Sequence, residues 1–301
     1  MTRYLALPRR LAARPFRAST SGLSRSRLRA SDLSAPHRDV RVPAALVDDL
    51  LMRCVALSTV LPEGACFSHR TAALLWGVPM PASGGDDLHV TVPAPVRAPR
   101  IRGVVGHQSR AVERVRVPAG LWVSTPGRAI CDSAPDLDRV QLVSVVDHLL
   151  STRTAADLSE AIAAHPHPQV ARLTRALAEA RPGVDSPRET ALRLAIVDAG
   201  FPEPVVNGYV QSAEGFIVAK ADLSYPRYRV AIEYEGDHHR TDRRQWFRDV
   251  ARYRELESLD WIALRVTTAD LTPSPRDLLA QLALHLRRRG CPLPTVRLPP
   301  R

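Results

Sequence analysis

The amino-acid sequence predicts a mixed α/β protein of the α+β kind, whose final hundred or so residues form a mixed sheet flanked by helices. Two observations carry this prediction. Between residues 186 and 290 the patterns run helix, three strands, helix, strand and helix, an order that mixes antiparallel and parallel neighbours. Upstream of residue 186, helical and strand patterns alternate between Gly and Pro turns, which indicates a second α+β region.

The chain of 301 residues is long enough for two or three domains. Its patterns divide it into a basic segment like a reduced helix-turn-helix, an α+β domain with a helical linker, a second domain and a tail, at 1–45, 46–185, 186–290 and 291–301. The boundary near 185 follows RPGVDSP, which is rich in turn-forming residues.

The first 45 residues are rich in arginine and contain two acids, Asp32 and Asp39. PFRAST and LSRSRLRASDL resemble short helical pieces, and residues 39–42 resemble a strand, which together fit a reduced helix-turn-helix with a partial wing. Nucleic-acid contacts would then come from a recognition helix that carries Arg25, Arg27 and Arg29. The alternative is a disordered basic arm that binds any polyanion.

The middle segment shows alternating helix and strand patterns. Helices are expected at 68–79, beginning with a cap at Ser68 and ending near Gly77, and at 125–134 and 140–150. Strands are expected at 88–93, 102–110 and 120–125. Residues 151–185 are Ala-rich and helical, with an interruption by HPHP at 165–168, where two prolines favour a turn over a metal site.

The segment from 186 to 290 carries the sharpest patterns. It begins with an amphipathic helix, ETALRLAIVDAG, that ends at Gly200. Strands follow near 204–211, 216–223 and 228–235, then a helix at 242–258, a strand at 261–267 and a last helix at 275–289.

Carboxylates gather on one face of these strands. Asp222 ends one strand pattern, and the next alternates between a face with Tyr228, Val230, Ile232 and Tyr234 and a face with Arg229, Ala231, Glu233 and Glu235. Alternate residues on a strand lie about 6.6 Å apart, where two unit charges repel by about 2.5 kcal/mol at an effective dielectric near 20. A hard divalent cation removes that repulsion. The alternative is an ordinary solvated strand face.

The segments SPRETALRLAIVDAGFPEPVVN, ADLSYP, VAIEYEGDHH and RDVARYRELESLDWIALRVT together resemble the PD-(D/E)xK nuclease superfamily, in its branch of very-short-patch-repair (Vsr-like) endonucleases and a related bacterial family of unknown function. The resemblance implies a restriction-endonuclease-like fold and a site for Mg²⁺ or Mn²⁺. It implies that Asp222 and Glu233 bind the metal, that Glu189 orients the metal or a water, and that His239 faces the scissile phosphate.

The sequence departs from this family at one position. Glu235 stands where the motif has its lysine, which puts lysine-assisted activation of water in doubt. Lys220 lies two residues before Asp222 on the same strand face and could supply the ammonium group. A capping box that begins at Ser186 would by itself explain Glu189.

A column of arginines follows the acidic strands. Its members recur every four residues along the expected helix and are Arg240, Arg244, Arg248 and Arg252. Like charges stacked in this way destabilise a helix unless an anion lies across them, so phosphate contact is expected. The alternative is partial pairing with acids of the same helix.

SHRTAALLWGVP, HVTVP, VVGHQSR and GLWVSTPGRAICD resemble the antitoxins of type IV abortive-infection toxin–antitoxin systems (AbiEi-like), over residues 15–150. That resemblance implies a small DNA-binding winged helix followed by a second domain. Ser68, His69 and Arg70 match the motif of that family, although a helix start needs only Ser68, and His107 could be a polar strand residue.

The formal net charge is +11 and Lys220 is the only lysine. Such a charge favours polyanionic partners, above all nucleic acid, although arginine bias also fits a GC-rich genome. The four cysteines form no CxxC pair and predict reduced thiols. With no apolar stretch near 20 residues and no secretory signal, the expectation is a cytoplasmic protein without membrane association.

These patterns together predict a metal-dependent DNA endonuclease, with Mg²⁺ or Mn²⁺ as cofactor, fused to an antitoxin-like DNA-binding region and acting in phage defence or DNA repair. Two alternatives stay open: a DNA-binding regulator or antitoxin on a degenerate nuclease fold, and a toxin that cleaves RNA. The expected partner is double-stranded DNA; a toxin partner or homodimer is not decided.

Overall fold

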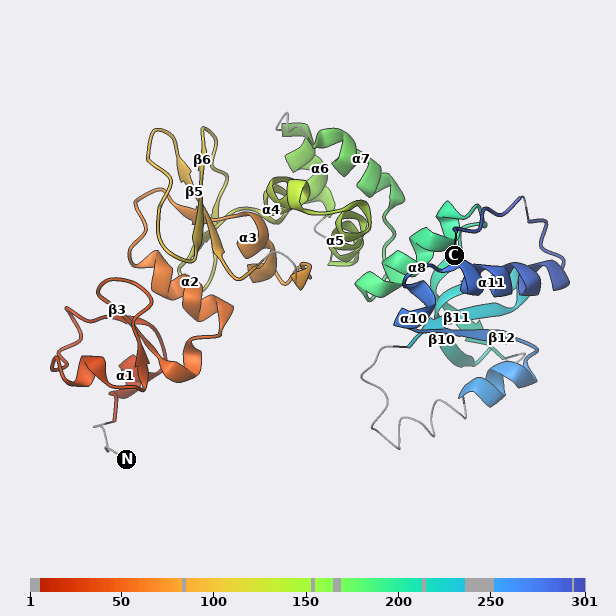
Figure 1. Cartoon of the computed structure of the whole chain (residues 1–301), viewed down its shortest axis with the longest axis horizontal. Coiled ribbons are helices and arrows are strands. Elements are labelled where there is room, and N and C mark those ends of the chain that lie inside the picture. The colour runs from red at the N-terminus through yellow and green to blue at the C-terminus, as the bar shows by residue number, and fades with distance from the viewer. Residues whose placement is uncertain are drawn as a thin grey trace. The chain divides into compact units, whose positions relative to one another are not determined.

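The structure is a computed structural model that describes residues 6–82, 85–152, 155–164, 169–212, 215–235, 252–293 and 295–300. These residues form a mixed α/β protein with three sheets, which confirms the expected fold class (Figure 1). The chain divides into two compact units, one of Met1–Asp136 and Thr154–Thr174, the other of Leu137–Arg153 and Arg175–Arg301. The segment expected as one domain at 46–185 therefore contributes to both units.

The first unit begins with a small antiparallel sheet. Its strands, in the order β1-β3-β2, are β1 (Phe16–Arg17), β3 (Val40–Pro43) and β2 (Leu33–Ser34). Around it lie α1 (Arg9–Ala12), η1 (Arg27–Arg29), η2 (Ala44–Leu46) and α2 (Leu50–Ser58). Val40 and Val42 pack on Ala56 of α2, so this sheet has its own apolar core.

The expected helical piece at PFRAST is wrong. Phe16 and Arg17 pair with Arg41 and Val40, and the buried ring of Phe16 alternates with an exposed Arg17. Pairing with β3 therefore decides the conformation of a segment too short to hold a helix alone. The strand expected at 39–42 is confirmed as β3.

A five-stranded sheet forms the rest of the first unit. Its strands, in the order β6-β5-β4-β8-β7, are β6 (Val104–Ser109), β5 (Leu88–Pro93), β4 (Cys66–Phe67), β8 (Trp122–Val123) and β7 (Val115–Arg116). Helices α3 (His69–Leu75), α4 (Pro126–Ser133) and α6 (Ala155–Ala164) belong with it, and η4 (Ala134–Asp136) follows α4. Helix α7 (Val170–Glu179) is divided between the two units. The three expected strands are confirmed, whereas the two-residue strands β4 and β7 were not predicted. HPHP lies outside the described residues.

The second unit contains a four-stranded mixed sheet. In the order β12-β11-β10-β9, its strands are β12 (Ile262–Val266), β11 (Val230–Tyr234), β10 (Ile217–Tyr225) and β9 (Val205–Gln211). Strands β9, β10 and β11 are antiparallel neighbours, whereas β11 and β12 are parallel. The order of elements expected for 186–290 is therefore present wherever the structure describes this segment.

The third strand of that series starts later than expected. Pro226–Tyr228 form the short helical turn η5, and Arg229 adopts the left-handed conformation with φ of 51°. Strand β11 thus begins at Val230 rather than at Tyr228. The alternation of faces holds from Val230 onward, where Val230 and Ile232 enter the core.

Helices cover both faces of this sheet. Helices α8 (Pro187–Asp198) and α11 (Arg276–Arg288) lie on one face, where Leu192 and Leu282 pack against Ile232 (Figure 1). Residues 252–258 are helical, and Leu256 packs with Val210 and Ala219 in a separate cluster. The rest of the expected helix at 242–258 lies outside the described residues, and α10 (Thr268–Leu271) follows β12.

Helix α5 (Arg139–Thr152) packs against α8 through a buried ion pair. Arg193 of α8 donates to both oxygens of Asp147, at 3.3 and 3.2 Å, and the two side chains are 2% and 1% exposed. Asp147 also accepts from the Arg181 backbone amide and the Thr190 hydroxyl, so donors of three residues satisfy both oxygens of its carboxylate. Within the described part of the chain, no helix has the length and apolar character that crossing a bilayer requires.

Candidate functional site

Asp222 and Glu233 occupy facing positions on neighbouring strands. Strands β10 and β11 pair Leu223 with Ile232 and Ser224 with Ala231, and this antiparallel register, continued by one residue, sets Asp222 opposite Glu233. Side chains directly opposite in an antiparallel pair point to the same face, with Cβ atoms about 4.5–5.5 Å apart. The sheet therefore brings together the two acids that the nuclease resemblance selects.

The Asp222 carboxylate is held by the backbone of the neighbouring strand. Its Oδ2 accepts a hydrogen bond of 2.7 Å from the amide of Tyr234. Burial nevertheless raises the pKa of Asp222 above the ordinary value for aspartate, although this hydrogen bond and the charges of Arg252 and Lys220 act in the opposite direction. A raised pKa means that the ionised carboxylate lacks full compensation in this position.

Glu189 joins this acidic face from the start of α8. Ser186 is the N-cap, and its side chain accepts from the Glu189 backbone at 3.3 Å, as the predicted capping box requires. The Glu189 carboxylate, however, accepts from the backbone of Asp185 at 3.0 Å rather than from the Ser186 backbone amide, as a full capping box would require. Burial raises the pKa of Glu189, and the negative charges of Asp222 and Asp185 raise it further, so Glu189 and Asp222 are electrostatically coupled.

Glu233 is buried, with a side chain 6% exposed, and basic and phenolic donors surround it. Arg252 donates to its Oε2, and the hydroxyl of Tyr253 donates to the same oxygen at 3.2 Å. Both donors come from the helical residues 252–258, which cover this face of the sheet. An arginine thus neutralises the acid for which the resemblance implies a metal.

Glu235, which replaces the lysine of the nuclease motif, has a similar environment. It accepts from Arg265 of β12 and from the Tyr253 hydroxyl. The Arg265 guanidinium holds the pKa of Glu235 below its ordinary value, so this carboxylate is stable as the anion. Glu235 is consequently a charged anchor for Arg265 and Tyr253, with no feature of a proton donor.

Lys220 lies on β10 two residues before Asp222, as expected, but its ammonium group contacts another acid. It donates to Asp185 at 2.6 Å, and this hydrogen bond raises the pKa of Lys220. The lysine side chain is 43% exposed. Lys220 therefore supplies a positive charge at the edge of the acidic face, close enough to lower the pKa of Asp222.

The remaining expected residues divide into three groups. His239 and three members of the arginine column lie outside the described residues; they are Arg240, Arg244 and Arg248. The fourth member, Arg252, is turned toward Glu233. In the N-terminal segment Arg25 and Arg29 are exposed, whereas Arg27 is buried and makes a bidentate contact with Asp32 at 2.8 and 2.7 Å.

The acidic face offers the oxygen ligands that a hard cation prefers, but its carboxylates are too far apart to surround one. Carboxylates of Asp222, Glu233 and Glu189 are the oxygen ligands that Mg²⁺ prefers. Among the described residues, however, the ligand atoms of these three acids do not all converge within 4.8 Å. Arg252 and Tyr253 both donate to Oε2 of Glu233, so a metal that used this oxygen would have to displace them.

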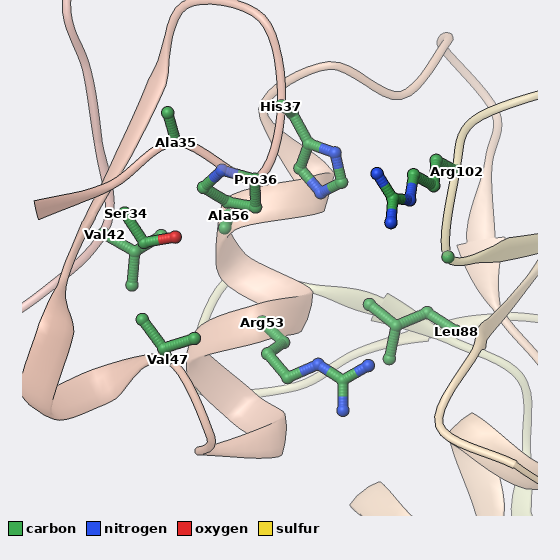
Figure 2. Close-up of a pocket in the computed structure, with 11 residues that line it drawn as sticks. Ser34, Ala35, Pro36, His37, Val42, Val47, Arg53, Ala56, Leu88 and Arg102 are labelled. Atoms are coloured by element: carbon green, nitrogen blue, oxygen red, sulfur yellow. The ribbon is translucent and has the colours of Figure 1, made fainter.

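The first unit carries two hollows lined by arginine. One cavity of about 390 Å³ lies between the small sheet, α2 and β5, and Figure 2 shows His37, Arg53 and Arg102 among the residues that line it, together with apolar side chains such as Val47 and Leu88. A second hollow of about 440 Å³ is bordered by Arg10 and Arg14. Guanidinium groups clustered in this way suit phosphate oxygens.

Sequence reasoning missed three contributors to the acidic face: Tyr253, Arg265 and Asp185. The Tyr253 hydroxyl contacts both Glu233 and Glu235. The only sequence signal for Arg265 was its exposed position in the alternating pattern of β12. Its contact with Glu235 depends on the parallel pairing of β11 with β12, which no local pattern predicts.

Comparison with known proteins gives relatives but no function. No protein-family model matches the chain. The chain is 27% identical over 250 residues to uncharacterized proteins of Mycobacterium tuberculosis strain CDC 1551 (MT2308) and strain H37Rv (Rv2248). Each match covers 82% of this chain and 90% of the relative, so the similarity extends through both compact units.

Proposed function

We propose that this protein is a metal-dependent DNA endonuclease whose hydrolytic site is the acidic face of the β10–β11 pair. The observation that carries the proposal is the opposition of Asp222 and Glu233 across an antiparallel register, with Glu189 coupled to Asp222 by charge. Acids with shifted pKa values that share one face are typical of functional sites.

In this proposal the chain's own residues position the reacting groups. Asp222, fixed by the Tyr234 amide, and Glu233 would hold Mg²⁺ or Mn²⁺, and Glu189 would orient a water molecule. A bound divalent cation supplies Lewis acidity and lowers the pKa of a water ligand. Lys220 at the edge of the face would stabilise negative charge on the phosphate. His239 stays a proposed contact to the scissile phosphate, outside the described residues.

DNA binding would come from the basic surface of the chain. The net charge of +11 favours a polyanion, and the hollows near Arg53, Arg102 and Arg14 offer guanidinium groups to phosphates. Arg25 and Arg29 remain proposed contacts because both are exposed, whereas Arg27 is committed to Asp32. The antitoxin-like role of the first unit, a place in phage defence or repair, and a cytoplasmic location are parts of the same proposal; four buried free cysteines accord with the last.

One observation favours a second candidate, a DNA-binding regulator or antitoxin that does not hydrolyse its target. Arg252 pairs with Glu233, Arg265 pairs with Glu235, and neither acid needs a metal to balance its charge. A face neutralised by arginines is what a binding platform without chemistry would retain.

The deciding experiment is a plasmid-nicking assay of the full chain with Mg²⁺ or Mn²⁺, and parallel incubation with total RNA. Wild-type protein should nick DNA, and the isosteric change D222N/E233Q should reduce the rate at least about 100-fold, equivalent to about 2.7 kcal/mol. Asp198→Asn, an exposed acid at the end of the same unit's α8, is the matched control and should retain the wild-type rate.

Calorimetric titration with Mg²⁺ separates the candidates further. The endonuclease should bind the metal, and D222N/E233Q should lose that binding. Retention of DNA in EDTA with neither metal binding nor cleavage would instead establish the non-hydrolytic regulator. Cleavage of RNA but not DNA would instead support the RNA-directed toxin. Cleavage by D222N/E233Q at the wild-type rate would show that Asp222 and Glu233 are not needed for hydrolysis.

A further inference from the structure

Three histidines from three different elements meet in the first unit. His69 stands at the start of α3, His89 on β5 and His107 on β6, and one ligand nitrogen from each lies within 4.8 Å of the other two. The Nδ1 of His89 and the Nε2 of His107 are 3.1 Å apart. All three side chains are partly exposed, so a solute can reach them.

Their spacing suits a metal ion. Two nitrogens bound to one tetrahedral zinc ion at about 2.05 Å lie about 3.3 Å from each other. The pair formed by His89 and His107 already meets that distance. The ring of His69 is stacked on that of His107, with ring centroids 3.7 Å apart and an interplanar angle of 14°, so the His69 ring would have to turn to direct its nitrogen at the same metal ion.

The fold fixes this arrangement from the backbone outward. Strands β5 and β6 pair in parallel, with Thr91 opposite His107, which puts His89 and His107 on one face as diagonal neighbours. The start of α3 is tied to β5 by two bonds: the Ser68 amide donates to the His89 carbonyl at 3.1 Å, and the His89 amide donates to the Thr71 hydroxyl at 2.8 Å.

The side chain of Ser68, the residue before His69, makes no capping hydrogen bond to helix α3. Ser68 occupies the N-cap of α3 as predicted, yet the expected cap interaction is wrong, since its side chain makes no cap hydrogen bond. Its oxygen instead accepts from Thr91 at 2.7 Å and lies 3.0 Å from Nδ1 of His69. Metal-binding histidines are commonly oriented by a hydrogen bond at the nitrogen that does not coordinate.

The backbone of His69 is also unusual. Its φ of 49° is left-handed, a conformation that costs energy for a residue with a Cβ. Such outliers cluster at functional positions. Beside His107, Gly106 lets the backbone pass close to Pro99, whose carbonyl oxygen would lie 2.4 Å from an added Cβ.

The electrostatic environment of His89 and His107 is also relevant to metal binding. Burial lowers the pKa of His89 and of His107, and the nearby charge of His89 lowers that of His107 further. The neutral imidazole is the form that coordinates a metal ion.

We propose that His69, His89 and His107 form a binding site for a transition-metal ion of the Zn²⁺ class, with a fourth position open to solvent or a ligand. Imidazole nitrogens select zinc, copper, nickel or iron over Mg²⁺. Three histidines with one open position form the ligand set of reactive rather than purely structural zinc sites. The site lies in the first unit, and its existence does not depend on the acidic face of the second.

The test is metal titration of the full chain after removal of metals by chelation, with Zn²⁺ followed by calorimetry and Co²⁺ followed by visible absorption. In the double variant H89Q/H107Q the affinity for one Zn²⁺ ion should fall at least about 100-fold, since changes to residues that only support metal ligands already cost about 10- to 100-fold. His285→Gln on α11 of the second unit is the control and should bind as wild type does.

Two results would overturn the proposal: no uptake of Zn²⁺ or Co²⁺ by wild-type protein, or wild-type affinity in H89Q/H107Q. Circular dichroism of the metal-free variant establishes its fold. If that variant does not fold, imidazole NMR of wild-type protein decides instead. Zn²⁺ must then shift the signals of His69, His89 and His107, and shifts confined to other histidines would refute the site.

Discussion

Arg252 donates to the carboxylate of Glu233, the acid that stands opposite Asp222 in the sheet. The arginine is 32% exposed and the acid 6% exposed, so the pair lies at the rim of the helix that covers this face. A metal-dependent hydrolase would use Glu233 as a ligand, whereas a binding platform would keep the ion pair. Competition between the guanidinium and a divalent cation is therefore the physical question at this site.

Arg252→Met should destabilise the fold by about 1–3 kcal/mol, because a buried carboxylate loses a charged hydrogen-bond donor. Under the endonuclease proposal, added MgCl₂ should restore part of that loss by occupying the vacated position. Urea unfolding with and without Mg²⁺ measures both effects. Arg254→Met, an exposed arginine of the same helix, should change the free energy of unfolding by less than about 0.5 kcal/mol. Equal stability of R252M and wild type would show that Glu233 does not depend on Arg252.

Asp222→Asn should make the protein more stable at neutral pH. The folded-state pKa of Asp222 is raised, so its contribution to stability is fully present below the ordinary aspartate pKa, about 3.9, and is lost as pH rises through the raised value. Asn cannot ionise and avoids that loss, while its side-chain oxygen can still accept from Tyr234. The urea midpoints of D222N and wild-type protein, measured from about pH 3.5, near the ordinary carboxyl pKa values, to about pH 7.5, should diverge as pH rises.

Glu235→Gln provides a comparison of opposite sign. The pKa of Glu235 is lowered by Arg265, so this acid stabilises the fold above the ordinary glutamate pKa, and the contribution is lost as pH falls through the lowered value. E235Q should therefore be less stable than wild type at pH 7, with a difference that disappears in acid. The same sign for D222N and E235Q would contradict the two environments described above.

Arg193→Met should cost about 3–5 kcal/mol, because it leaves the Asp147 carboxylate buried without its ion-pair partner. The double variant D147N/R193M should recover much of that loss, since no unpaired charge remains in the interface between α5 and α8. Arg139→Met is the control: its side chain is 42% exposed, and its pairs with Glu179 and Asp198 are worth about 1 kcal/mol or less. Chemical denaturation of the three variants should show this ranking; additive losses in D147N/R193M would count against the pair.

Ser186→Ala should lose about 1 kcal/mol of stability, because the N-cap of α8 then has no side-chain acceptor for the Glu189 amide. Thr125→Val is the matched comparison at the N-cap of α4. The Thr125 side chain makes no cap hydrogen bond, and its buried hydroxyl has no partner among the described residues. T125V should therefore be neutral or stabilising in thermal unfolding. A larger loss in T125V than in S186A would contradict this account of the two caps.

Periodicity and turn chemistry determined most of the secondary structure. The alternation of Val230, Ile232 and Glu233 marked one apolar and one acidic face, and the Ser186 cap and Gly200 marked both ends of α8. These are local signals, because a strand's period and a helix's caps depend on residues within a few positions of each other. Two-residue strands such as β4 and β7 offer little of this local signal and were not predicted, with β8 as the exception.

The sequence by itself determined which residue types are present at the two candidate sites: carboxylates on β10 and β11, and histidines at 69, 89 and 107. Only the tertiary structure decided their partners. The parallel pairing of β11 with β12 brought Arg265 to Glu235, the covering helix brought Arg252 to Glu233, and the pairing of β5 with β6 beneath α3 gathered the three imidazoles. Contacts between residues distant in sequence depend on strand register and helix packing, which no local pattern encodes.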